Sequence, residues 1–153
     1  MSALRCTVVL LLLAGLAHGQ ATPATNGTTP EETVQRYLAA LQKEDFRAAY
    51  DCLSQGMLKG KSRDVFVAET QALLRLTETT ISGIHVYPGK VEGDKAFVPN
   101  LLNSKDRFIN QLGLPEHELY TLVREDGRWK VDQQTLLEAG DEEKWFPPEA
   151  RTK

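Results

Sequence analysis

The sequence has few of the side chains that bind metals, cross-link a chain or attract nucleic acid. It contains 2 cysteines and 3 histidines in 153 residues, and 18 Lys and Arg are outnumbered by 21 Asp and Glu. No run of basic residues occurs, so the electrostatic footprint of a nucleic-acid-binding protein is missing and nucleic acid is not an expected partner. His85 and His117 have no acidic cluster at ligand spacing. We therefore expect no metal site and no cofactor.

One long apolar run occurs, and it lies at the N-terminus. Arg5 precedes "VVLLLLAGLA", and the run ends in the small-residue pattern "AHG". The run is shorter than the roughly 20 residues that a membrane-spanning helix needs, and its flanks are those of a secretory signal peptide. We predict a signal peptide over residues 1–19, with cleavage after Ala21 as the alternative. The mature protein is then secreted or periplasmic, with no membrane attachment.

Cys6 is removed with the signal peptide, so Cys52 is the one cysteine that remains. No intrachain disulfide is therefore expected, and packing must provide the stability. The place of Cys52 in a helical apolar pattern predicts a small buried side chain. Residues 20–30 are rich in Thr, Ala, Pro and Gly and predict a flexible linker. Residues 31–136 are the predicted domain, and residues 137–153 are a C-terminal tail.

Helical signals fill the first half of the domain. Thr29 as N-cap, Pro30 and Glu32 predict a helix that runs to about Gln42. Its apolar positions follow the i, i+3, i+4, i+7 spacing of one buried face: Val34, Tyr37, Leu38 and Leu41. Asp45 predicts the cap of a second, short helix with the apolar positions Phe46, Ala49, Tyr50 and Leu53. Ser62 opens a third helix to about Thr77, whose buried face is drawn from Val65, Phe66, Ala72, Leu73 and Leu76.

From Thr79 onward the apolar period becomes alternating, which predicts a sheet. The segment "TISGIHVYPGKVEGDKAFVPNLL" predicts two strands joined around Gly93-Asp94. Pro99 lacks the N–H of a ladder hydrogen bond, so we expect an edge or a bulge there. The following "SKDRFINQLGLPE" predicts a loop with one helical turn.

The segment "HELYTLVREDGRWKVDQ" predicts two strands joined by the type I′ turn dipeptide Asp126-Gly127. The expected cross-strand pairs are Arg124 with Trp129, Leu122 with Val131, Val123 with Lys130, and Tyr120 with Gln133. One face then collects Tyr120, Leu122, Trp129 and Val131, and the helices must cover it. The predicted fold class is α+β, with three N-terminal helices packed in the concave face of a curved antiparallel sheet.

The helix phrase "VQRYLAALQKEDFRAAYDCLS", followed by a sheet that ends in "YTLVREDGRWKV", resembles the nuclear transport factor 2-like superfamily. This cone-shaped, cystatin-like fold is shared with ketosteroid isomerase and polyketide cyclases, and the hairpin phrase is most similar to secreted bacterial members of unknown function. The resemblance covers residues 31–134. It implies an apolar cavity at the mouth of the cone, with Tyr37, Tyr50, Tyr120 and Trp129 as ligand-binding residues.

The resemblance also implies a chemistry to test. In ketosteroid isomerase the tyrosine that matches Tyr37 donates a hydrogen bond to a developing enolate oxygen, and a carboxylate base is needed beside it. The base should follow the second helix, where "SQGMLKGK" has no Asp, Glu or His. The second acid of that enzyme has Glu118 as its nearest match. Tyr37 and Glu118 are therefore the candidate catalytic residues.

Two functions follow from these observations. The favoured one is an exported non-catalytic binding or interaction domain, whose cone-shaped apolar pocket or exposed sheet receives a small apolar ligand or another protein. The alternative is a small isomerase- or cyclase-type enzyme that acts on a hydrophobic carbonyl compound with Tyr37 as proton donor. A homodimer through the sheet is a further expected assembly. Trp145 and Phe146, near the C-terminus, either fold back as a lid or form a partner-binding segment.

Overall fold

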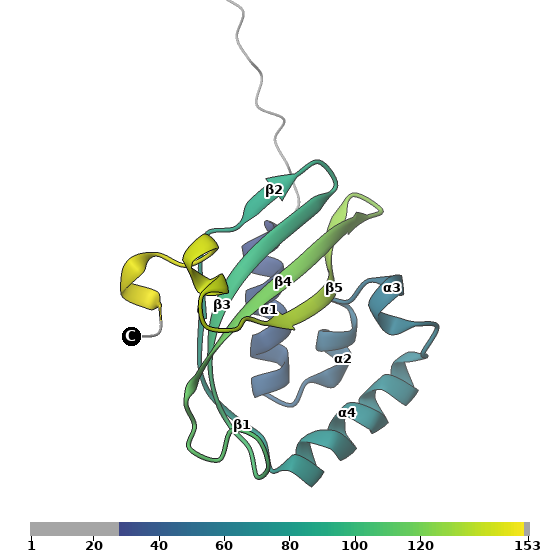
Figure 1. Cartoon of the computed structure of the whole chain (residues 1–153). Coiled ribbons are helices and arrows are strands. Elements are labelled where there is room, and N and C mark those ends of the chain that lie inside the picture. Colours follow the sequence, from purple (N-terminus) through teal and green to yellow (C-terminus); the bar gives the residue numbers. More distant parts are fainter. Residues whose placement is uncertain (1–27, 152–153) are drawn as a thin grey trace, which may run out of the picture.

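The first half of the domain forms four helices in the computed structural model (Figure 1). They are α1 (Pro30–Gln42), α2 (Phe46–Tyr50), α3 (Gln55–Leu58) and α4 (Arg63–Thr77). The structure describes residues 28–151, so the predicted signal peptide (1–19) and most of the predicted linker (20–30) lie outside the described residues.

Side chains at the helix starts explain three of these elements. Thr29 and Glu32 form the predicted capping box of α1, in which Glu32 N donates to Thr29 Oγ1 and Thr29 N donates to Glu32 Oε2. Asp45 caps α2 and Ser62 caps α4, as predicted. The second helix is shorter than expected, because the chain leaves it at Asp51 and Leu53 pairs with Val131 of the sheet.

The short helix α3 was not predicted. Ser54 is its N-cap and accepts a hydrogen bond from Met57 N, while its own hydroxyl donates to Asp132 of the last strand at 2.5 Å. A contact between residues so far apart in sequence gives no local signal. This contact therefore fixes a turn of helix where the sequence pattern indicates only a break.

Five antiparallel strands form one sheet in the order β1-β3-β4-β5, with β2 also paired to β3. Their bounds are β1 (Thr80–Val86), β2 (Lys90–Glu92), β3 (Lys95–Lys105), β4 (Pro115–Glu125) and β5 (Arg128–Leu136). With the helices in front, the predicted α+β class and the curved antiparallel sheet are confirmed (Figure 1).

The prediction of one strand before Gly93 was wrong, because the chain is interrupted between β1 and β2. The reason is Pro99 on the neighbouring strand β3. Tyr87 N donates to Pro99 O at 2.9 Å, but Pro99 has no N–H to return that bond, so the ladder stops there. Strand β3 itself is not an edge strand, since it pairs on both sides. The expectation of an edge or a bulge at Pro99 was therefore wrong for β3, and the interruption lies on the neighbouring chain segment instead.

The β4–β5 hairpin confirms most of the predicted pairs, including Arg124 with Trp129 and Leu122 with Val131. The pair Tyr120 with Gln133 was wrong, because the register shifts next to Leu122 and Tyr120 pairs with Gln134. The extra residue on β5 is Asp132, whose carboxylate is held by Ser54. A bulge of this kind adds one residue to one strand, so it moves Gln134 onto the inner face.

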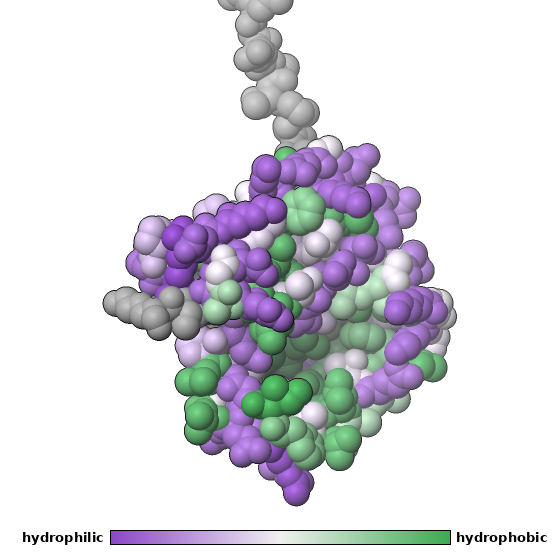
Figure 2. Space-filling view, in the orientation of Figure 1, coloured by the Kyte–Doolittle hydropathy of each residue, from purple (hydrophilic) through white to green (hydrophobic). Residues whose placement is uncertain are grey.

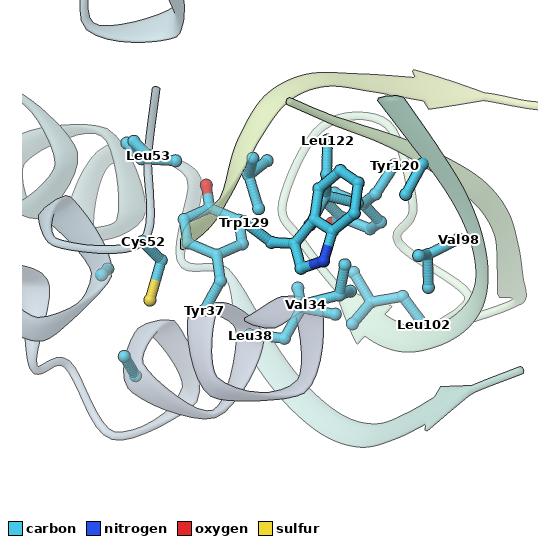
Figure 3. Packing of buried hydrophobic residues seen from close by; sticks show 14 of the residues in the cluster. Val34, Tyr37, Leu38, Cys52, Leu53, Val98, Leu102, Tyr120, Leu122 and Trp129 are labelled. Atoms are coloured by element: carbon cyan, nitrogen blue, oxygen red, sulfur yellow. The ribbon is translucent and has the colours of Figure 1, made fainter. Parts of the chain in front are cut away.

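The core lies between α1 and the concave face of the sheet. Val34, Tyr37 and Leu38 of α1 pack against the inward side chains of β3, β4 and β5, and Trp129 stands in the middle of the cluster (Figure 3). Cys52 is buried in this cluster, as predicted.

The predicted buried face of α4 was wrong for most of its residues, although Phe66 is half-buried against the core. None of its residues is buried, and Val65, Leu73 and Leu76 are 46%, 57% and 66% exposed. Its largest set of contacts is with α2 rather than with the sheet. The amphipathic pattern predicted the helix correctly but not what covers its apolar face.

The loop between β3 and β4, residues 106–114, forms turns without the predicted helical turn. The Asp106 carboxylate organises it by accepting from the backbone amides of Phe108, Ile109 and Asn110. Arg107 N donates to Thr77 O at 2.8 Å, which ties the loop to the end of α4. Its apolar side chains remain exposed: Phe108, Ile109, Leu112 and Leu114.

The C-terminal tail folds back against the face of the sheet that is turned away from α1 (Figure 1). It contains the 3-10 turns η1 (Asp141–Lys144) and η2 (Pro148–Ala150). Phe146 is 2% exposed and packs edge-on against Tyr87 and His117, while Trp145 lies against Phe97. Of the two alternatives for this segment, the structure shows the folded-back one.

Candidate functional site

A polar cluster crosses three strands on the inner face of the sheet, with Asn100, Glu118 and Tyr120 buried and Gln134 exposed at its margin. Its centre is the carboxylate of Glu118 on β4, which is 3% exposed. Asn100 Nδ2 donates to Glu118 Oε2 at 2.8 Å, and Tyr120 Oη donates to the same oxygen at 3.1 Å. Gln134 Nε2 donates to Glu118 Oε1 at 2.5 Å. An acid is thus held inside the cone by three neutral donors.

Strand register explains how these side chains meet. Asn100 on β3 is directly opposite Glu118 on β4, and both have the parity of the apolar core positions. Gln134 reaches the carboxylate because the bulge at Asp132 places it opposite Tyr120. Without the bulge, Gln133 would be opposite Tyr120 instead.

Burial shifts the acid–base behaviour of the cluster. Removal from water raises the pKa of Glu118, although hydrogen bonds from Asn100, Gln134 and Tyr120 partly oppose this. Burial, together with the charge of Glu118, raises the pKa of Tyr120 well above its usual value and the pKa of Tyr37 to about 12. Both phenols therefore stay neutral at physiological pH, and Glu118 holds its proton more tightly than an exposed carboxyl does.

One atom of the cluster lacks a hydrogen bond. Asn100 is 0% exposed, and its Oδ1 is the one fully buried side-chain N or O atom of the described residues without a partner. A buried acceptor left unpaired costs about 1–3 kcal/mol. The cluster can thus accept one more donor.

The structure brings three of the four predicted ligand-binding residues together. Tyr37 and Tyr120 form an edge-on ring pair with centroids 6.2 Å apart, and Trp129 lies beside them in the core (Figure 3). Tyr50 lies elsewhere, between α2 and α4, where its hydroxyl donates to Lys61 O and its ring packs against Phe66. Tyr37 is not among the three residues that donate to the Glu118 carboxylate.

A groove of about 440 Å³ lies outside this cluster, between α1, α2, α4 and the start of β1. We call it the α1–α4 groove. Its apolar wall consists of Leu41, Phe46, Leu74 and Ile81. Charged side chains at its rim are Glu44, Arg75 and Glu78. None of the four predicted ligand-binding residues lines it.

Exposed apolar side chains lie on the same side of the molecule. Leu73 and Leu76 of α4 are exposed, and Phe108 and Ile109 follow Arg107, which is bonded to the end of α4. Figure 2 shows a hollow between the sheet and α4, with hydrophobic residues gathered at its lower end. Contiguous exposed apolar surface of this kind marks binding sites more often than isolated residues do.

The described residues hold no group of three or more His, Cys, Asp or Glu side chains that could bind a metal ion. No helix within residues 28–151 is both long and apolar enough to cross a membrane.

Several solved structures are similar to this fold. RPA3114 from Rhodopseudomonas palustris, which contains a SEC-C motif, matches with a TM-score of 0.54 and 16% identity over 72% of this chain and 80% of its own. A domain of unknown function with a cystatin-like fold from Nostoc punctiforme matches with a TM-score of 0.52 and 14% identity, over 76% and 83%. A proposed ketosteroid isomerase from Shewanella frigidimarina matches with a TM-score of 0.50 and 17% identity, over 74% and 98%. These likenesses show the cystatin-like α+β fold.

The likenesses concern the fold and not a reaction, because the sequence identities are only 14–17%. The chain spans only 38% of a longer structure, Bd1075 from Bdellovibrio bacteriovorus. No family model and no curated protein sequence matches the chain.

Sequence reasoning identified Glu118 but missed its partners Asn100 and Gln134. Asn100 had a usable signal, since it is a polar residue at an inward position between Val98 and Leu102. No sequence signal pointed to Gln134, because its position opposite Tyr120 depends on the bulge at Asp132. The α1–α4 groove was also missed, since it exists only because α4 stands away from the sheet.

Proposed function

We propose that the protein is an exported non-catalytic binding domain that holds a small apolar ligand in the α1–α4 groove. The proposal rests mainly on the packing of α4. This helix is amphipathic, yet none of its residues is fully buried among the described residues 28–151. Phe66, near the start of α4, packs on Tyr50 and the core, but Leu73 and Leu76 stay exposed. Burial of apolar surface is favourable, so the open part of this face is available to a ligand. A volume of about 440 Å³ lies within the range of small-molecule sites.

The chemistry of the groove supports an apolar ligand. Leu41 and Phe46 form one wall and Leu74 the other. Gln42 is already engaged, since its Nε2 donates to Ile81 O at 3.1 Å. The polar groups at the rim orient a ligand rather than provide its main contact area.

Mass spectrometry of small molecules retained by the purified mature protein tests this proposal. We expect an apolar compound in the wild type and its loss from Leu74→Asp, because the carboxylate places a charge in the apolar wall. The control is Val91→Asp, at an exposed position on β2. Equal retention by all three proteins, or none in the wild type with no binding of added apolar probes, contradicts the proposal.

A second function, isomerase- or cyclase-type chemistry, is favoured by one specific observation. Glu118 is a buried carboxyl with a raised pKa whose charge acts on Tyr37. Such groups cluster at catalytic sites. Two observations argue against an enzyme. Tyr37 is not one of the three residues that donate a hydrogen bond to Glu118, and neither Tyr37 nor Glu118 lines the α1–α4 groove.

Deuterium loss from carbon next to the carbonyl in a panel of apolar ketones tests the second function. Under the binding proposal, neither wild type nor Tyr37→Phe accelerates the exchange. Acceleration by the wild type that falls by orders of magnitude in Tyr37→Phe and Glu118→Gln would establish an enzyme.

A further inference from the structure

A second groove, of about 450 Å³, lies along the outer edge of β5. We call it the β5-edge groove. Three cationic side chains line it together with one carboxylate, and the remaining wall is formed by Thr28, Ala48 and Trp129. The cations are Arg36 from α1 and Arg128 and Lys130 from β5; the carboxylate is Asp51.

Among the described residues, these cations have no acidic partner. Within residues 28–151, none of Arg36, Arg128 and Lys130 forms a salt bridge. The one carboxylate in the groove, Asp51, is bound by Arg63. Positive charge is therefore concentrated in one groove of a protein whose net charge is −3.

Two of the cations are held in place by the fold. Arg36 Nε donates to the buried Cys52 Sγ at 3.3 Å, which anchors the inner edge of the guanidinium. Lys130 Nζ donates to the backbone oxygen of Asp51. Arg36 therefore keeps its two terminal nitrogens for another acceptor. Ordering these side chains in advance lowers the entropy cost of binding.

The strand edge adds a backbone donor. Val131 N donates to Cys52 O and Val131 O accepts from Ser54 N, both at 2.8 Å, so Val131 directs its backbone groups away from β4. Trp129 lies two residues earlier on the same strand, and residues two apart share an edge. Its N–H therefore points to the side on which the groove lies.

We propose that the β5-edge groove binds a small oxyanion that carries at least two negative charges, such as a phosphate monoester or a di- or tricarboxylate. Guanidinium groups bind such oxygens through paired hydrogen bonds. A singly charged anion balances only one of the three cations. The site is separate from the α1–α4 groove and shares no residue with it.

Calorimetric titration of the mature protein with inorganic phosphate and with citrate, at low salt, tests the proposal. We expect saturable binding of at least one probe and weaker binding of acetate. Arg128→Gln should weaken binding by about tenfold or more, because a hydrogen bond to a charged group contributes on that order. Lys105→Gln, which removes an exposed cation from the opposite end of the sheet, should leave binding unchanged.

Two further measurements sharpen the test. In a Trp145→Phe background Trp129 is the one remaining tryptophan, so its fluorescence should change on binding. Leu74→Asp, which disables the α1–α4 groove, should leave oxyanion binding intact. Absence of saturable binding, no effect of Arg128→Gln, or an equal effect of Lys105→Gln would each overturn the proposal.

Discussion

Glu118 shows how one buried acid shapes the chemistry of this fold. Its carboxylate has neutral partners on three sides and no cation among them. Neutral donors only partly replace water around a charge, which is why the pKa of Glu118 rises. The residue is thus better suited to hold a proton than to form an ion pair.

The raised pKa of Glu118 predicts a pH-dependent stability. Between its ordinary value of 4.5 and the higher folded value, the folded protein binds more protons than the unfolded chain. The neutral Glu118 carboxyl therefore makes its full contribution to the free energy of unfolding below pH 4.5. This contribution is lost as the pH rises through the pKa of Glu118 in the folded protein. Glu118→Gln removes this loss, so the variant should gain stability relative to wild type as the pH rises. Urea unfolding from pH 4 to pH 8 measures the free energy of unfolding of both proteins. A difference between them that does not change with pH would contradict the prediction.

Trp129 is the residue that we expect to contribute most to the core. It is 5% exposed, with the Arg124 guanidinium 4.4 Å from its ring centre. Trp129→Ala should cost about 3–5 kcal/mol as a large truncation in a packed core. Arg128→Ala, at the preceding and exposed position, should cost under about 1 kcal/mol. Denaturant unfolding compares them, and equal small effects would show that Trp129 does not anchor the hairpin.

Helix α4 is the element whose packing differs most from its pattern. Its apolar residues recur at helical spacing, yet its contacts are mainly with α2. Salt bridges tie its first half to neighbours, from Asp64 to Arg47 and from Glu69 to Lys61. Exposed pairs of this kind contribute little. The helix is therefore held less firmly than α1.

We expect α4 to open before the sheet does. Local stability follows buried apolar contact, and α4 has no buried residue whereas β3 and β4 are central strands. In hydrogen exchange, amides of α4 should exchange faster than those of β3 and β4. A ligand bound in the α1–α4 groove should slow α4 selectively. Equal protection of helix and sheet in the free protein would contradict this.

At the scale of the whole molecule, the sheet separates two environments. Helix α1 covers the concave face, and the C-terminal tail covers part of the opposite face. His117 contributes to this cover, since its Nε2 is 2.5 Å from Ala150 O and its Nδ1 is 3.3 Å from Glu142 Oε1. A homodimer through the sheet remains a prediction, and the tail lies where such a partner would pack.

Removal of residues 140–153 should therefore increase self-association. Truncation uncovers Phe97, Tyr87 and His117, whose ring contacts are provided by Trp145 and Phe146. Exposed apolar surface favours association. Sedimentation velocity compares the protein with and without residues 140–153. Lys144→Ala is the control, because it leaves Phe146 in place. A truncated protein that stays monomeric at high concentration would contradict the expectation.

Local sequence by itself determined the helix starts and the hairpin turn. Thr29, Asp45 and Ser62 cap helices through bonds to residues three positions away, and Asp126-Gly127 forms its turn without help from the rest of the chain. The alternation around Trp129 likewise determined which face is buried. Interactions over such short distances leave their signature in neighbouring residues, so the α+β class could be predicted.

Only the tertiary structure decided what these elements face. Asp132 makes a bulge because Ser54 holds it, and that bulge is what carries Gln134 to Glu118. The position of α4 leaves the α1–α4 groove open, and the contact of Arg36 with Cys52 helps to form the β5-edge groove. Each depends on residues far apart in sequence, and periodicity shows which face of an element is apolar without naming the partner that covers it.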